Sequence, residues 1–297
     1  RPHLEVWKRE LIMTFETMMF WTATVLYAFA TLVVVSGVVF RRDRLVLFAF
    51  GMTGTAFAAH TLSIIARWIG TGRLPYVQDY ENALTGSWAI VLMFLIVSLV
   101  LPRTRVAGLI VLPFVLLTMG YGLLVPSEVG PVTPAYRSVW LVIHVLFAWA
   151  TYAGYTSAAS LAGIELLKSR RKPLKPKSVL DRTPDLERLR ELTFRLVAFG
   201  FVVNAVMIAS GAIWAYELWG SYWRWDPVET WSLLTWLAYA FYLHAYLTLG
   251  WRGRRLATVA FMALFGVMMS FWGVQFAPTT FHLFDNIGGD IPLNQLR

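Results

Sequence analysis

The sequence predicts an all-α polytopic membrane protein with eight transmembrane helices and both termini outside. Of its 297 residues, 58% are hydrophobic and only 14% are charged, whereas about a quarter of the residues in a soluble domain are charged. Eight stretches lack Asp, Glu, Lys and Arg, and each is long enough to cross a bilayer, which takes about 20 helical residues. The alternating polarity of barrel strands is missing.

The expected spans follow one another along a single membrane domain, residues 18–278. Residues 1–17 form an outer N-terminal segment and residues 279–297 an outer C-terminal tail. In the fourth span, Pro113 predicts a bend or an interrupted run of hydrogen bonds. The eight spans are 18–40, 45–66, 82–102, 106–127, 138–164, 196–216, 230–251 and 256–278.

The distribution of basic residues predicts the orientation of these spans. Connections 41–44, 103–105, 165–195 and 252–255 hold eighteen of the 26 Lys and Arg residues, and basic residues near span ends mark the cytoplasmic side. The net charge of +9 therefore reflects topology and does not indicate nucleic-acid binding. Connection 165–195 begins basic and proline-broken, then forms a short charged helix for which Asp181 to Glu187 could supply the cap.

Apart from the tyrosines, histidines supply the only ionisable side chains inside the predicted spans. The predicted spans contain no charged residue, and the chain contains no cysteine, which excludes thiol catalysis and thiolate metal sites on this chain. Seven residues separate His60 from Arg67 and His144 from Arg137, which places both imidazoles about 10 Å below the outer surface. His244 lies about 12 Å above the inner surface by the same rise, and His282 lies outside. Each imidazole is either a hydrogen-bonded packing group or a haem ligand.

The outer connection 217–229 contains the strongest local pattern. Five tryptophans fall within eighteen residues: Trp219, Trp223, Trp225, Trp231 and Trp236. An interfacial aromatic belt would spread tryptophans over many helix ends, so this concentration favours a platform that stacks on a flat, partly apolar ligand. Arg224 could meet a carboxylate such as a haem propionate.

The acidic residues at the end of this loop match a helix start. Asp226, Pro227 and Glu229 occupy the N-cap, N1 and N3 positions of the seventh span, which is a capping-box arrangement. We therefore expect capping rather than direct ligand contact for both carboxylates.

With these residues in place, the chain resembles the WWD-domain haem-handling proteins of cytochrome c biogenesis, and within them the CcsA (ResC) branch. The resemblance extends over about residues 45–284. It rests on WDPVETW at 225–231, on His60 with Arg-Trp at 67–68 and Pro-Tyr…Tyr-Glu at 75–81, on His144, and on Tyr-Leu-His244 followed by GWRG at 250–253.

The resemblance implies a haem transporter and cytochrome c synthase subunit that works with a CcsB (ResB) partner. Haem b is then the substrate, and it is presented at the outer face for covalent attachment to the CxxCH thiols of apocytochrome c. Thiol-reducing proteins of the outer compartment keep these thiols reduced. His144 and His282 match the outer haem ligands and His244 an inner ligand, whereas His60 is a weaker candidate. The expected location is a bacterial inner (plasma) membrane or a plastid thylakoid membrane.

Two other functions compete with this interpretation. A b-type electron-transfer subunit would pair histidines on facing spans at matching depths, would keep its haem and would exchange electrons with quinol. A permease that does not use haem would use the tryptophans as a gate and would show no haem absorption.

Overall fold

The computed structural model describes residues 2–129, 134–170 and 179–273, and every regular element within these ranges is a helix. The α-helices are α1 (Pro2–Val39), α2 (Asp43–Thr71), α3 (Asp79–Val100), α4 (Gly108–Gly122), α5 (Val139–Ser169), α6 (Leu186–Trp219), α7 (Pro227–Leu247), α8 (Arg254–Met262) and α9 (Leu264–Phe271). Three short 3-10 helices connect them: η1 (Pro102–Ala107), η2 (Pro134–Arg137) and η3 (Val179–Arg182).

The eight expected helices are all present, with the eighth formed by α8 and α9 in succession. In the described part of the chain, seven helical segments are long and apolar enough to cross a membrane, the fourth being η1 with α4 and the last α8 with α9. Helix α7 is not among the seven, because its three tyrosines, two tryptophans and one histidine lower its mean hydropathy. The protein is therefore a helical membrane protein.

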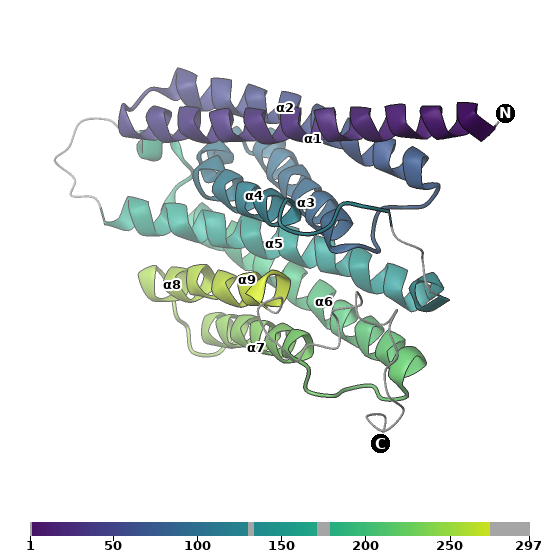
Figure 1. Ribbon diagram of the computed structural model, residues 1–297. Helices are drawn as coiled ribbons and strands as arrows, with labels where there is room; N and C mark the ends of the chain where they lie inside the picture. The colour runs from purple at the N-terminus through teal and green to yellow at the C-terminus, as the bar shows by residue number, and fades with distance from the viewer. Residues whose placement is uncertain (1, 130–133, 171–178, 274–297) are drawn as a thin grey trace.

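The long helices lie side by side, with α5 in the middle (Figure 1). Helices α1 and α2 pack against each other along one side, and α6 to α9 lie on the other. The end at which α6 ends and α7 begins is called the loop end. The opposite end, which holds connections 41–44, 103–105 and 252–255, is called the basic end. Helix α1 starts at the loop end.

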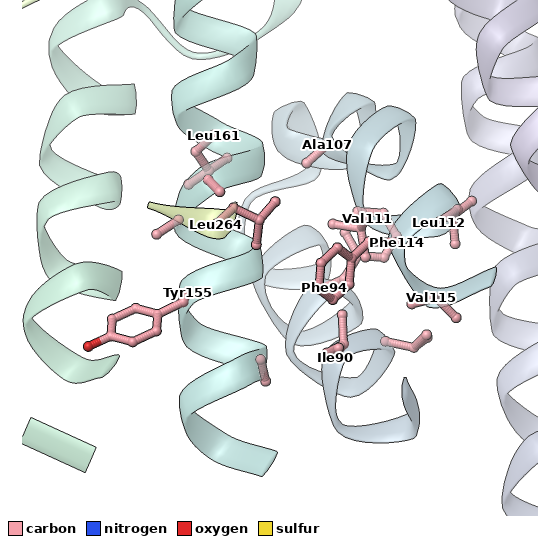
Figure 2. Packing of buried hydrophobic residues seen from close by; sticks show 14 of the residues in the cluster. Ile90, Phe94, Ala107, Val111, Leu112, Phe114, Val115, Tyr155, Leu161 and Leu264 are labelled. Carbon is pink, nitrogen blue, oxygen red and sulfur yellow. The ribbon is translucent and has the colours of Figure 1, made fainter. Parts of the chain in front are cut away.

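Helix α5 forms the centre of the core because small residues dominate its middle. Every residue from Ala153 to Glu165 is buried, and nine of these thirteen residues are Ala, Gly, Ser or Thr, which allow neighbouring helices to approach closely. Figure 2 shows Leu161 of α5 beside Leu264 of α9, with Phe94 and Phe114 from α3 and α4 on the other side.

Most of the helices extend beyond the apolar stretches that predicted them. Helix α1 begins at Pro2 rather than at residue 18, and α6 begins at Leu186 rather than at residue 196. The cap of α6 is Asp185, whose carboxylate accepts a hydrogen bond from the backbone nitrogen of Arg188 at 2.7 Å. The predicted cap at Asp181 is wrong, because Asp181 belongs to η3 and Pro184 separates that turn from α6. Helix α4 continues across Pro113.

Candidate functional site

The tryptophan-rich connection at the loop end is a short turn between two capped helices. Gly220 ends α6 in the left-handed conformation, at φ 69°, which glycine adopts without steric cost. Asp226 starts α7 and accepts a hydrogen bond from the backbone nitrogen of Val228 at 2.8 Å. Asp226 and Glu229 form the predicted capping box, so the expected helix start is confirmed.

Glu229 also organises the loop itself. Its Oε2 accepts from the backbone nitrogens of Arg224, at 2.8 Å, and of Asp226, at 3.3 Å. Between them, Trp225 has a φ of 59°, a region that costs a non-glycine residue roughly 1 kcal/mol or more. The Glu229 carboxylate therefore holds Trp225 in a strained conformation, with 69% of its side chain exposed.

Arg224 anchors the other half of the loop. Its guanidinium donates to the carbonyl oxygen of Trp219 at 2.8 Å and lies 5.9 Å from the centre of the Trp219 ring. Trp223 and Trp225 meet edge to face at 5.8 Å. The predicted cluster of Trp219, Trp223, Trp225 and Arg224 is thus one contiguous structure, and its contact with haem stays a prediction.

His144 lies in α5 against the facing helix α6. Its Nδ1 is 2.8 Å from the carbonyl oxygen of Met207. Because a carbonyl oxygen only accepts, this bond places the ring proton on Nδ1, and the lone pair of the neutral ring is then on Nε2. Metal-ligating histidines are oriented by the same kind of bond.

Two cavities meet at His144. The larger one opens at the loop end and has a volume of about 170 Å³. Its polar wall comes from α3 and from tyrosines of several segments: Tyr76, Asp79, Asn82, Tyr121, Tyr136 and Tyr152. Its apolar wall includes Trp149, Trp214 and Phe271. Apolar and aromatic walls that carry a few polar groups are typical of small-molecule and cofactor sites.

The smaller cavity connects His144 to the tryptophan loop. Its volume is about 40 Å³, and it is lined by Trp223, Glu229 and Ser232 on the loop side and by Met207 and Gly211 on α6. His144, Trp214 and Val228 line both cavities. An imidazole and an indole-rich loop, 79 residues apart between His144 and Trp223 in the sequence, therefore share one site.

A buried ion pair supports the wall that faces His144. Arg67 and Glu81 are fully buried, and their Nε and Oε1 atoms lie 3.2 Å apart. Glu81 also accepts from Arg73 at 2.6 Å and from the backbone nitrogens of Val77 and Gln78. The carboxylate thus fixes the connection 72–78, which carries Tyr76 into the larger cavity.

A second buried carboxylate ties this network to α1. Glu16 accepts a hydrogen bond from the hydroxyl of Tyr80 at 2.5 Å, and the Arg67 guanidinium lies 5.0 Å from the centre of the Tyr80 ring. These charged residues lie just beyond the predicted apolar spans but inside the observed helices, so the buried groups include carboxylates and an arginine as well as histidines.

His60 is fully buried and bonded at both ring nitrogens. Its Nε2 lies 2.9 Å from the carbonyl oxygen of Leu84 and its Nδ1 lies 3.4 Å from the hydroxyl of Tyr27. It lines neither of the cavities around His144. These contacts favour the packing alternative for His60.

The other two candidate ligands lie apart from this site. His244 is exposed on α7, between the half-buried Leu243 and the buried Ala245. Its side chain therefore faces the surroundings of the chain rather than its core. His282 lies outside the described residues, so its approach to His144 stays a prediction.

Several residues of the site had no individual signal in the sequence. Met207 contributes a backbone carbonyl, and Gly211 contributes space, since an added Cβ would lie 2.6 Å from Nδ1 of His144. Asn82 contributes a buried Oδ1 with no hydrogen-bond partner among the described residues. Only the Pro-Tyr…Tyr-Glu motif at 75–81 pointed to the wall that Tyr76 and Asp79 form.

The fold and the cavities define a polytopic helical membrane protein with a histidine-containing aromatic site at one end. Residues 56–282 match the family described as "Cytochrome C assembly protein". The chain belongs to this cytochrome c assembly family.

Curated relatives support the same assignment. The cytochrome c biogenesis protein CcsA of Welwitschia mirabilis is 32% identical over 252 residues, covering 76% of this chain and 83% of that protein. CcsA of Guillardia theta is 34% identical over 269 residues, covering 83% and 88%, and CcsA of Gloeobacter violaceus is 31% identical over 295 residues, covering 81% and 87%.

A solved structure shares the fold. The cytochrome c haem lyase CcmF superposes with a TM-score of 0.66 at 16% identity, over 87% of this chain and 47% of that protein. The present chain therefore spans about half of that structure, and at this identity the likeness is one of fold.

Proposed function

We propose that this protein holds haem for cytochrome c maturation, as the haem-presenting subunit of a holocytochrome c synthase. The observation that carries the proposal is the bond from Nδ1 of His144 to the carbonyl oxygen of Met207, in a ring that lines both cavities. This bond orients the ring, and in the neutral imidazole it places the lone pair on Nε2, the atom that would ligate haem iron.

The lining of the two cavities fits a flat, largely apolar substrate with two carboxylates. Trp149, Trp214 and Trp223 offer aromatic surface for the porphyrin, since aromatic rings favour stacked and edge-to-face contacts. Arg224, at the neighbouring loop, supplies a guanidinium for a propionate. The second axial ligand in this proposal is His282.

The basic connections support placing the loop end outside the cytoplasm, because Lys and Arg near span ends are retained on the cytoplasmic side. The site then faces the periplasm of a bacterium or the lumen of a plastid thylakoid. We propose that both termini lie on this outer side.

The covalent step joins haem to thiols that this chain does not contain. In each attachment a cysteine S–H adds across a haem vinyl group: an S–C and a C–H bond form while the S–H bond and the vinyl π bond break, so no net electrons are required. The chain has no cysteine, so both thiols come from the CxxCH motif of apocytochrome c, and separate thiol-reducing proteins keep them reduced. Holding haem and peptide in register supplies the rate gain.

The exposed His244 supports a role for a partner subunit. A single imidazole on the membrane-facing side of α7 is costly in lipid unless another group covers it. We propose that His244 ligates haem on its way outward, together with a ligand from a CcsB (ResB)-type subunit.

The test is production of a holocytochrome. The chain is co-expressed with a CcsB-type subunit and a CxxCH reporter, and covalent haem is stained on a denaturing gel. His144→Ala should abolish the product, and added imidazole should restore part of it. His3→Ala is the matched control. Unchanged product from His144→Ala would falsify the proposal.

Absorption spectra of the purified complex separate this function from its rivals. A synthase subunit loses its haem band when the CxxCH reporter is supplied. A b-type electron-transfer subunit keeps the band and is reduced by quinol, and a permease shows no band.

A further inference from the structure

A third cavity lies at the basic end, far from the tryptophan loop. Its volume is about 320 Å³, and it is formed where α2 begins and where η1 and η3 pack beside it. Four arginines line it: Arg44, Arg103, Arg105 and Arg182. Asp43 is the one carboxylate among its lining residues, and it pairs with Arg182. The cavity therefore has a clear excess of positive charge.

Arg105 shows that this charge is not balanced within the described chain. Its guanidinium lies 4.7 Å from the centre of the Phe50 ring, which holds the cation against an apolar wall. Its Nε is buried and has no hydrogen-bond partner among the described residues. A buried unsatisfied donor is costly, and an anionic oxygen in the cavity would remove that cost.

The floor of the cavity is apolar, which restricts the kind of anion that fits. Val46 and Leu47 of α2, Val106 of η1 and Val179 of η3 line it, and Leu47 is 55% exposed. Such a site suits a molecule with a negatively charged head and an apolar body. Its described lining residues include no histidine, methionine or tyrosine, so they offer haem iron no axial ligand.

We propose that this cavity binds the phosphate headgroup of an anionic phospholipid from the leaflet at the basic end. The phosphate contacts Arg103 and Arg105, and the acyl chains leave along Leu47. Basic pockets between membrane helices bind anionic headgroups in this way. Bound there, the lipid links three segments that are distant in the sequence, α2, η1 and η3.

The test uses short-chain phosphatidylglycerol and phosphatidylcholine, titrated into the purified full chain in detergent and followed by native mass spectrometry. The wild-type chain should bind phosphatidylglycerol in preference to phosphatidylcholine. The double variant Arg103→Ala/Arg105→Ala should bind phosphatidylglycerol about tenfold more weakly or worse, because two charge-assisted hydrogen bonds are lost. The matched control is Arg254→Ala/Arg255→Ala, which removes two exposed arginines from the same end.

Two further variants keep the proposal testable if the alanine variant does not fold. Arg103→Lys/Arg105→Lys keeps the charge and should retain most of the binding. Asp43→Asn should tighten it, because the substitution removes the one carboxylate that lines the cavity among the described residues.

Three results would overturn the proposal. Equal weakening in the Arg254/Arg255 control would show non-specific attraction. Full competition by millimolar inorganic phosphate would identify a soluble anion as the occupant. Displacement of phosphatidylglycerol by an equimolar amount of haemin would identify another amphiphile.

Discussion

The imidazole of His144 occupies the space that a side chain at position 211 would fill. An added Cβ on Gly211 would lie 2.6 Å from Nδ1 and 2.8 Å from Cε1 of the ring, which is closer than carbon and nitrogen atoms pack. Gly211 on α6 therefore sets how closely the ring of His144 can approach the carbonyl of Met207, and both contacts come from the same helix.

Gly211→Ala should displace His144 and weaken haem binding without removing the imidazole. A misplacement of about 1 Å in a binding group can lower activity by about a hundredfold, so we expect haem affinity to fall by about tenfold to a hundredfold. The measurement is haem titration of the purified protein by absorption, with added imidazole restoring the spectrum. The control Gly54→Ala, at a position with nothing within 4 Å of the new Cβ, should leave the haem affinity unchanged.

Glu81→Gln should destabilise the loop end. The substitution leaves the buried Arg67 without its charge partner, and breaking a buried ion pair costs about 3–5 kcal/mol. Thermal unfolding in detergent measures the loss. The control Glu191→Gln removes an exposed carboxylate that pairs with Arg188 and Arg195 and should cost less than about 1 kcal/mol. Equal effects of the two variants would contradict a structural role of the buried pair.

Asp226 can be tested as a helix cap independently of any ligand contact. Asp226→Ala removes an N-cap, which costs about 1 kcal/mol, and should lower both stability and holocytochrome yield. Asp226→Ser keeps the cap and should recover most of both. A serine variant that is stable yet makes no product would show that the Asp226 carboxylate acts on haem or peptide.

His60→Ala should lower stability but not haem affinity. The substitution removes the hydrogen bond between the ring and the carbonyl of Leu84, which contributes about 0.5–1.5 kcal/mol, and it opens a cavity at a fully buried position, which adds to the cost. The haem bound per folded molecule should equal that of the wild type, and added imidazole should have no effect. A haem loss that imidazole reverses would instead make His60 a ligand.

The helices could be predicted from the sequence because a bilayer requires long apolar stretches, and their true ends could not. A helix continues wherever its backbone bonds are satisfied, so α1, α2, α3 and α6 run past the apolar stretches that predicted them. Glu16, Arg67 and Glu81 lie in these extensions, and their mutual neutralisation exists only once α1, α2 and α3 are packed. The Asp226–Glu229 cap was predictable because it depends on neighbours in sequence.

The site was predictable in its residue types and only partly in its geometry. His144 could be predicted because an imidazole is costly inside a membrane, and the tryptophans because five of them fall within eighteen residues. Met207 and Gly211 act through a carbonyl and through the absence of a side chain, and neither has a signature in a single sequence.

The buried middle of α5 also limits how the protein can move. Thirteen consecutive residues are buried, from Ala153 to Glu165, so α5 cannot slide or rotate without displacing the helices packed around it. His144 lies on the same helix and is held in place with it. Under the proposed function, any rearrangement that admits haem would therefore fall to the short loop around Trp225 rather than to α5.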